Sequence, residues 1–253
     1  MASYPTEPHY FDSGDGQRLA WWERGEGRPV VLIHGYFSNA HTNWIRYGHA
    51  ALIAQRGFRV IMPDLRGHGH SAKPHDPAAY PPDILMRDGL ALIDHLGLTD
   101  YDLGGYSLGG RTTMRLLAAG ARPCRAVIAG MGLDGIVDTG GRGTYFRHVL
   151  ENLGTFGQGS PEWLTEAFLK TTRGDPVALG LILDTFVDTP IEKVAAVTVP
   201  TLVLCGVEDD DNGSGAALAG AMPHGIFVEM PGNHMSAVVK PELGRAIADF
   251  LSA

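Results

Sequence analysis

The chain has 253 residues, of which 44% are hydrophobic and 19% are charged, a composition typical of a folded globular protein with a sizeable core. Its formal net charge of -8, without a long run of lysine and arginine, argues against a nucleic-acid partner and favours a small-molecule substrate. No apolar stretch approaches the ~20 residues of a membrane helix, and the first residues do not resemble a signal peptide, so we expect a cytoplasmic protein without a membrane partner. Cys124 and Cys205 adjoin apolar runs and are expected to be reduced thiols in the core.

The first half of the chain is predicted to alternate between strands and helices. Two short antiparallel strands come first, within residues 9–25, because a Gly-Asp-Gly turn separates two β-favouring segments. Short apolar runs then predict strands at 30–33, 58–62, 101–105 and 126–131, and the segments between them, up to about 55, over 82–97 and over 108–120, are predicted helices. This alternation is expected of a parallel sheet with helices on both faces.

The alternation stops between about Gly132 and Val197. Aromatic residues at loose helical spacing and glycine-rich joints predict several short helices there. The pattern then resumes, with strands at 201–205 and 226–230 and helices after each of them. The simplest architecture is an insertion of helices within a doubly wound sheet.

Candidate catalytic residues follow the predicted strands, because ligands gather outside the carboxyl ends of the strands in an open parallel sheet. Residues 105–109, Gly-Tyr-Ser-Leu-Gly, match the G-x-S-x-G pattern of a sharp strand-to-helix turn that presents a nucleophilic serine. Such a serine needs a base and an acid, which follow it in the order acid, histidine. Asp209 and His234 follow later strands in that order, so we expect Ser107 as nucleophile, His234 as base and Asp209 as the residue that orients His234.

Other carboxylates are alternatives for the acid. Glu208, Asp210 and Asp211 neighbour Asp209 in a charged run that is otherwise typical of a solvated loop. Asp134 follows an earlier strand and could also reach the histidine.

The oxyanion of the tetrahedral intermediate needs hydrogen-bond donors. We expect the backbone N–H of Leu108, at the start of the helix after Ser107, and that of Tyr36, in the loop after the 30–33 strand. His34 in the same loop is expected to brace the loop, because the role of base is already filled.

A histidine-rich segment, DLRGHGHSAKPHD, raises the question of a metal site. His68, His70 and His75 with Asp64 lack the tight cluster of ligands that metallohydrolases need, so no metal is predicted. Asp64 and Arg66 are expected instead to build a structural turn and an edge of the pocket.

The motifs HGYFSN, DLRGHGHS, GYSLGG, GVED and GNH resemble, in order and spacing, the landmarks of the α/β-hydrolase superfamily over nearly the whole chain. The resemblance implies an α/β-hydrolase fold: a mostly parallel eight-stranded sheet, helices on both faces and a helical lid. The core would comprise residues 1–132 and 198–253, and the lid residues 133–197.

The resemblance also implies an apolar substrate pocket, lined by the aromatic residues of the lid with Tyr36, Phe37 and Met235. Ser107 sets the chain apart from the haloalkane dehalogenases and epoxide hydrolases of the superfamily, which have an aspartate at the elbow. The expected function is that of a serine hydrolase without a cofactor, which cleaves a small, largely apolar carboxylic ester through an acyl-enzyme. Alternatives are hydrolysis of a carbon–carbon bond in a diketone, of a lactone or of a thioester by the same residues, or ligand binding without catalysis.

Overall fold

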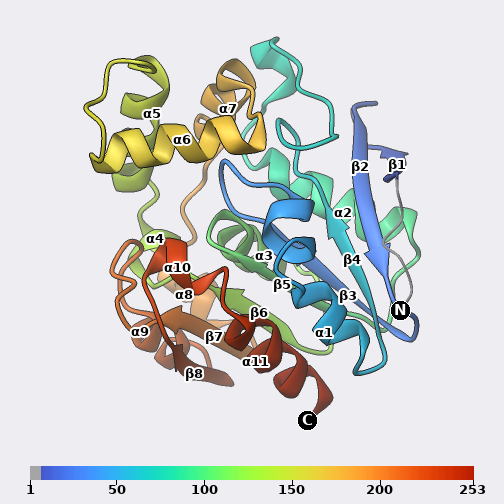
Figure 1. Cartoon of the computed structure of the whole chain (residues 1–253). Helices are drawn as coiled ribbons and strands as arrows, with labels where there is room; N and C mark the ends of the chain where they lie inside the picture. The colour runs from blue at the N-terminus through green and yellow to red at the C-terminus, as the bar shows by residue number, and fades with distance from the viewer. Residues whose placement is uncertain (1–6) are drawn as a thin grey trace.

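The computed structural model describes residues 7–253 and is built around one eight-stranded sheet (Figure 1). The strands are β1 (His9–Asp12), β2 (Arg18–Arg24), β3 (Arg28–Ile33), β4 (Phe58–Pro63), β5 (Asp102–Tyr106), β6 (Ala126–Ala129), β7 (Thr201–Gly206) and β8 (Gly225–Met230). They lie in the order β1-β2-β4-β3-β5-β6-β7-β8; the pairs that involve β2 are antiparallel, and all the others are parallel. The prediction of a mostly parallel sheet with an antiparallel edge is confirmed.

The strand order reverses at β3, which lies between β4 and β5. After β3 the chain moves outward to β4, and it then returns to the other side of β3 to form β5. The loops after β3 and β5 therefore leave the same edge of the sheet on either side of a crevice, which is where doubly wound sheets bind ligands. These two loops carry Tyr36 and Ser107.

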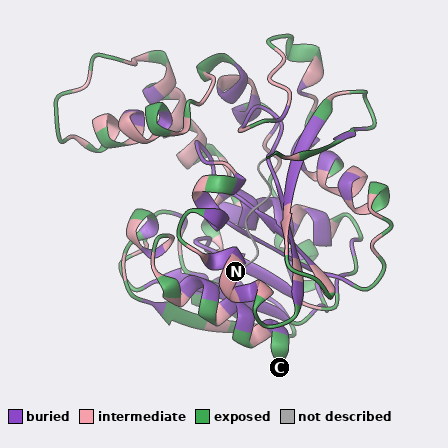
Figure 2. Cartoon of the chain, turned by 45° about the vertical axis from the view of Figure 1, so that its right-hand side comes forward, coloured by how far each residue is buried: buried purple, intermediate pink, exposed green. Residues whose placement is uncertain are grey.

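Helices cover both faces of the sheet, as predicted. They are α1 (His49–Ala54) and α11 (Pro241–Ser252) on one face, and α2 (Ile84–His95), α3 (Leu108–Ala118) and α9 (Gly215–Gly220) on the other. Successive side chains of a strand point to opposite faces, so Val30 and Leu32 of β3 share a buried cluster with α1 and α11, whereas Val31 and Ile33 share one with α2 and α3. Figure 2 shows the resulting arrangement, with buried strands beneath helices that are exposed on their outer side.

Five helices lie between β6 and β7: α4 (Asp134–Val137), α5 (Gly140–Glu151), α6 (Pro161–Thr172), α7 (Pro176–Leu183) and α8 (Ile191–Ala195). Helices α5, α6 and α7 lie together at the top of Figure 1, beyond the carboxyl ends of the parallel strands. Ser160 and Asp175 cap the N-termini of α6 and α7, and a proline follows each of them. The side chain of Ser160 accepts the N–H of Trp163, and that of Asp175 accepts the N–H groups of Val177 and Ala178. By contrast, Ile136 of α4 and Val194 of α8 pack with Met114 of α3 in the core.

Two local expectations need correction. Cys124 is exposed, because it lies in the loop before β6 and its Sγ faces Asp100, whereas Cys205 is buried in β7 as expected. The segment before residue 55 is not one helix but a π-helix, η1 (His41–Ile45), followed by α1. None of the helices formed by residues 7–253 combines the length and the apolar character that a bilayer crossing requires.

Candidate active site

Ser107 lies in the sharp turn between β5 and α3. Its backbone has φ 56° and ψ -115°, a conformation that residues with a side chain rarely adopt. Gly105 and Gly109 make the turn tight: a Cβ at Gly105 would overlap the backbone of Gly109, and a Cβ at Gly109 would overlap the carbonyl of Ile33. The sequence G-x-S-x-G therefore forms the elbow that its spacing predicts.

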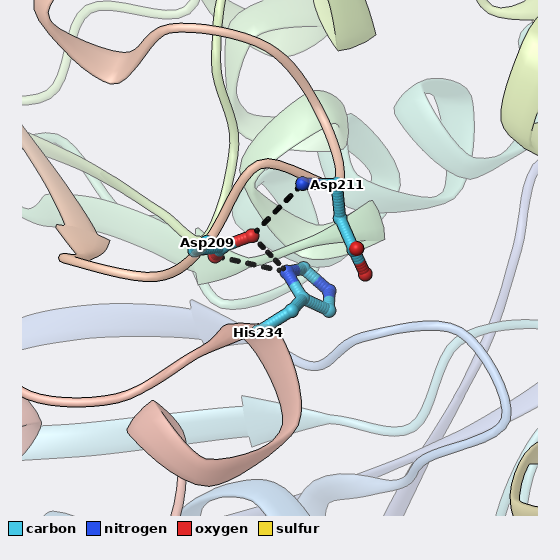
Figure 3. A group of neighbouring side chains, drawn as sticks. All are labelled: Asp209, Asp211 and His234. Atoms are coloured by element: carbon cyan, nitrogen blue, oxygen red, sulfur yellow. Dashed lines mark hydrogen bonds and ion pairs between the residues drawn. The ribbon is translucent and has the colours of Figure 1, made fainter. Parts of the chain in front are cut away.

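The structure brings Ser107, His234 and Asp209 together from three strand ends. Nε2 of His234 lies 3.0 Å from Oγ of Ser107. Nδ1 of His234 lies 3.0 and 3.1 Å from the two carboxylate oxygens of Asp209, as Figure 3 shows. If the neutral imidazole donates its Nδ1–H to the carboxylate, the lone pair of Nε2 faces the serine hydroxyl, which is the arrangement that proton abstraction requires.

Two neighbours fix the position of His234. Asn233 caps the short helix α10 (His234–Ala237), because its side chain accepts the N–H of Met235 and of Ser236. The hydroxyl of Tyr106, the residue before the nucleophile, donates a hydrogen bond of 2.6 Å to the backbone carbonyl of His234. Tyr106 thus ties the histidine loop to the elbow, and sequence patterns gave no signal for this contact.

The alternative acids lie differently. Asp211 is close to the imidazole, but its carboxylate forms an ion pair of 2.8 Å with Arg142 of α5. Among residues 7–253, His234 has no hydrogen bond to Asp134, whose carboxylate lies beside Gly213.

Ligand atoms of Asp209, Asp211 and His234 lie within 4.8 Å of one another (Figure 3). However, the hydrogen bonds to Asp209 and Ser107 occupy both ring nitrogens of His234, so this geometry suits proton transfer better than metal binding.

The loop after β3 lies directly against the nucleophile. The Cα of Gly35 faces Ser107, since a Cβ added there would lie 3.4 Å from the Cβ of the serine. Asn43 of η1 holds this loop, because its side-chain oxygen accepts the N–H of Gly35 at 3.0 Å. Within the described part of the chain, the N–H groups of Tyr36 and Leu108 donate to no other protein group. Both amides are therefore available to a substrate oxygen.

Three polar residues near the site, His34, Asp64 and Arg66, are structural. His34 is fully buried; its Nε2 accepts the N–H of Leu65 and its Nδ1 faces the carbonyl of Gly35, so it braces the loop as expected. Burial lowers the pKa of His34, which keeps the ring neutral in this role. Asp64 accepts the N–H groups of Ala40 and His70.

Arg66 is fully buried and pairs with Asp15 and Asp88. Neither Arg66 nor Asp64 lines the cavities at Ser107. Both instead border a separate small space of about 20 Å³ that is also lined by α2, and the hydrogen bonds of Asp64 confirm the structural turn.

A cavity of about 510 Å³ opens beside Ser107, beneath α5 and α6. A second space of about 200 Å³ reaches Ser107 from the side of η1 and α10. The expected aromatic lining is present in part: the residues that line the cavity include Tyr36, Phe37, Tyr145, Phe146, Phe168 and Met235, but not Phe156, Trp163 or Phe186. Aromatic and aliphatic walls suit a substrate with an apolar part.

Tyr36 connects the loop after β3 to the helices above the cavity. Its hydroxyl donates a hydrogen bond of 2.7 Å to the carbonyl of Leu179 in α7, and its ring packs at 4.7 Å on the ring of Phe146 in α5. Burial raises the pKa of this hydroxyl well above 10, so it stays a hydrogen-bond donor.

Two arginines, Arg111 of α3 and Arg142 of α5, reach a small chamber next to Ser107. The sequence analysis did not identify Arg111 as a site residue. Its position in the first turn after the elbow could have indicated it, because the helix is buried there.

Known proteins show where this chain belongs. Residues 28–181 match the family described as alpha/beta hydrolase fold. A segment of 124 residues is 40% identical to the dihydrolipoyllysine-residue acetyltransferase component of the acetoin cleaving system of Pseudomonas putida, over 47% of this chain and 31% of that protein. A segment of 138 residues is 35% identical to an epoxide hydrolase of Caballeronia sordidicola, over 54% of this chain and 40% of that protein. The matched segments thus span less than half the length of these relatives.

The solved structure of a thermophilic esterase from Thermogutta terrifontis has the same fold over its whole length. Its TM-score is 0.77 at 24% identity, and the alignment covers 97% of this chain and 98% of that one. The chain belongs to the α/β-hydrolase fold family.

Proposed function

We propose that this protein is a serine hydrolase that cleaves small carboxylic esters with a largely apolar part and uses no cofactor. The observation that carries the proposal is the continuous chain from Ser107 Oγ to His234 Nε2 at 3.0 Å and from His234 Nδ1 to the Asp209 carboxylate at 3.0 Å. An aspartate nucleophile, which the epoxide hydrolases and haloalkane dehalogenases of the superfamily use, is replaced here by Ser107.

The proposed reaction has two halves. In the first, His234 Nε2 takes the proton of Ser107, Oγ bonds to the ester carbon, and the amides of Tyr36 and Leu108 hold the oxyanion. The bond to the alkoxy group then breaks, and His234 gives its proton to the departing alcohol. In the second half, His234 deprotonates a water molecule, which attacks the acyl carbon. The bond between that carbon and Oγ then breaks, the acid departs, and His234 returns its proton to Oγ of Ser107.

A panel of phenyl esters of graded acyl length, assayed with wild type and with Ser107→Ala, tests the proposal. We expect hydrolysis by the wild type only, and covalent labelling of Ser107 by a fluorophosphonate probe in the folded protein. Failure of the probe to label Ser107, together with equal rates for the two proteins, would contradict the proposed function. A lactone, a thioester and a diketone in the same panel separate the alternative reactions.

A further inference from the structure

Arg111 is a buried cation without an anionic partner at the edge of the active site. Only 6% of the residue is exposed, and its Nε donates a hydrogen bond of 2.9 Å to the carbonyl of Gly135. Its two terminal NH₂ groups have no hydrogen-bond or ion-pair partner within residues 7–253. The other arginine that is almost fully buried, Arg66, is paired with two carboxylates. Neither terminal NH₂ group is among the fully buried side-chain atoms without a partner, so both keep accessible surface with which a ligand in the chamber can pair.

The surroundings of Arg111 offset its charge only in part. The guanidinium lies 4.8 Å from the centre of the Phe186 ring, which supplies only a cation–π contact. Burial lowers its pKa to about 10; the charge of Asp188 opposes this effect and that of Arg142 reinforces it. Buried charges in proteins are normally paired, since an unpaired one is costly.

The chamber that Arg111 reaches lies on the acyl side of the proposed reaction. It is lined by Ser107, by both proposed oxyanion residues, Leu108 and Tyr36, and by Arg142. His234 does not line it, whereas His234 does line the two larger cavities. Because His234 must protonate the departing alcohol, the alcohol belongs in a larger cavity and the acyl group points toward the chamber.

We propose that the acyl group of the substrate carries a carboxylate, which the guanidinium of Arg111 binds in this chamber, so that the substrate is the half-ester of a short dicarboxylic acid. This inference rests on the proposed function and deepens it. A guanidinium presents two parallel N–H donors that match a carboxylate. Arg142, which packs 5.1 Å over the ring of Phe146, adds positive charge to the chamber, although Asp211 partly neutralises it. The acyl chain must be short, because Arg111 lies only one helical turn from Ser107.

Two phenyl esters of nearly equal shape test the inference. In phenyl hydrogen succinate the acyl group ends in a carboxylate, and in phenyl isohexanoate an isopropyl group takes its place. We expect wild-type kcat/KM to be about 10- to 100-fold higher for the succinate, as for hydrogen bonds to a charged group. Arg111→Met should bring the ratio of the two kcat/KM values to about one, and Arg111→Lys should retain part of the preference.

Arg115→Met is the matched control. Arg115 lies one turn further along α3 but pairs with Asp83 and does not line the cavities at Ser107. Removal of Arg115 should preserve the ratio of the two kcat/KM values. If Arg115→Met lowers this ratio as much as Arg111→Met does, general positive charge, and not binding of the carboxylate at Arg111, sets the preference. A wild-type ratio near one would overturn the inference outright.

Two further readouts separate this inference from the proposed function. If the fluorophosphonate probe labels Ser107 and the isohexanoate is hydrolysed at least as fast as the succinate, the inference fails and the proposed function stands. If the probe does not label Ser107, binding is measured by thermal shift with phenyl hydrogen succinate in Ser107→Ala. If the ligand raises the Tm of Ser107→Ala but not that of Ser107→Ala/Arg111→Met, binding of the carboxylate by Arg111 is supported. An equal rise in Tm in the two proteins refutes it.

Discussion

Replacing Ser107 by glycine should stabilise the protein relative to replacing it by alanine. Both substitutions remove the hydroxyl and its hydrogen bond to His234, so they differ chiefly at the backbone. At φ 56° and ψ -115° a residue with a Cβ is strained by about 1–3 kcal/mol, whereas glycine is not. Glycine also loses about 0.5–1 kcal/mol more conformational entropy on folding. The difference favours Ser107→Gly by about 1 kcal/mol, or roughly 2–4 °C in Tm for a domain of this size.

Thermal and urea unfolding of the two variants, followed by circular dichroism, measures this difference. The matched control is Ala217→Gly, at an exposed position of α9, where glycine should lower the free energy of unfolding by about 1 kcal/mol. If glycine in place of alanine raises the free energy of unfolding at position 107 but lowers it at position 217, the backbone strain lies at Ser107. If Ser107→Gly is no more stable than Ser107→Ala, the elbow does not store strain and the reasoning is refuted.

Three other outcomes follow from the structure. Asp209→Asn should lower kcat for a phenyl ester by about 10⁴-fold, as for the corresponding acid in serine proteases, while Asp134→Asn should stay within about threefold of wild type; comparable losses would mean that the acid is misassigned. Burial lowers the pKa of His68 from 6.5 to about 3, so the folded protein keeps this ring neutral while the unfolded chain protonates it. The contribution of the neutral His68 to the free energy of unfolding is therefore complete above about pH 6.5 and falls by about 2–3 kcal/mol between about pH 6 and about pH 4. Urea titrations at several pH values should show a smaller decrease in the free energy of unfolding for His68→Gln. Arg66→Met should cost about 3–5 kcal/mol in the free energy of unfolding, because it leaves the buried carboxylate of Asp88 unpaired; a neutral result would show that this carboxylate is protonated instead.

Much of the fold and the candidate nucleophile could be predicted because both depend on local patterns. Apolar runs separated by helical segments specify a parallel sheet, and a parallel sheet places the ends of its strands along one edge. Ser107, the acidic run 208–211 and His234 all follow strands, so topology brings them to the same edge of the sheet. The order and spacing of the motifs favoured Asp209 within that run, but the turn after β7 decides which carboxylate faces the imidazole.

The sequence could not show what depends on side-chain direction. Arg111 and Arg115 are one turn apart on α3, yet one reaches the chamber beside Ser107 and the other pairs with Asp83. Which direction each takes depends on where the helices between β6 and β7 pack. The burial of Cys124 was predicted wrongly for a related reason. An apolar run shows that a strand is near, but it does not show at which residue the strand begins.

The hydrogen bond between Tyr36 and Leu179 joins two parts of the protein that are far apart in the sequence. The same residue carries a proposed oxyanion amide, while its ring forms part of the cavity wall and its hydroxyl binds α7. A substrate that displaces α7 therefore also displaces a proposed oxyanion donor. In such an arrangement the fit of the alcohol part in the cavity affects the turnover rate as well as the affinity. We therefore expect esters that fill the cavity poorly to show a lower kcat before their KM rises.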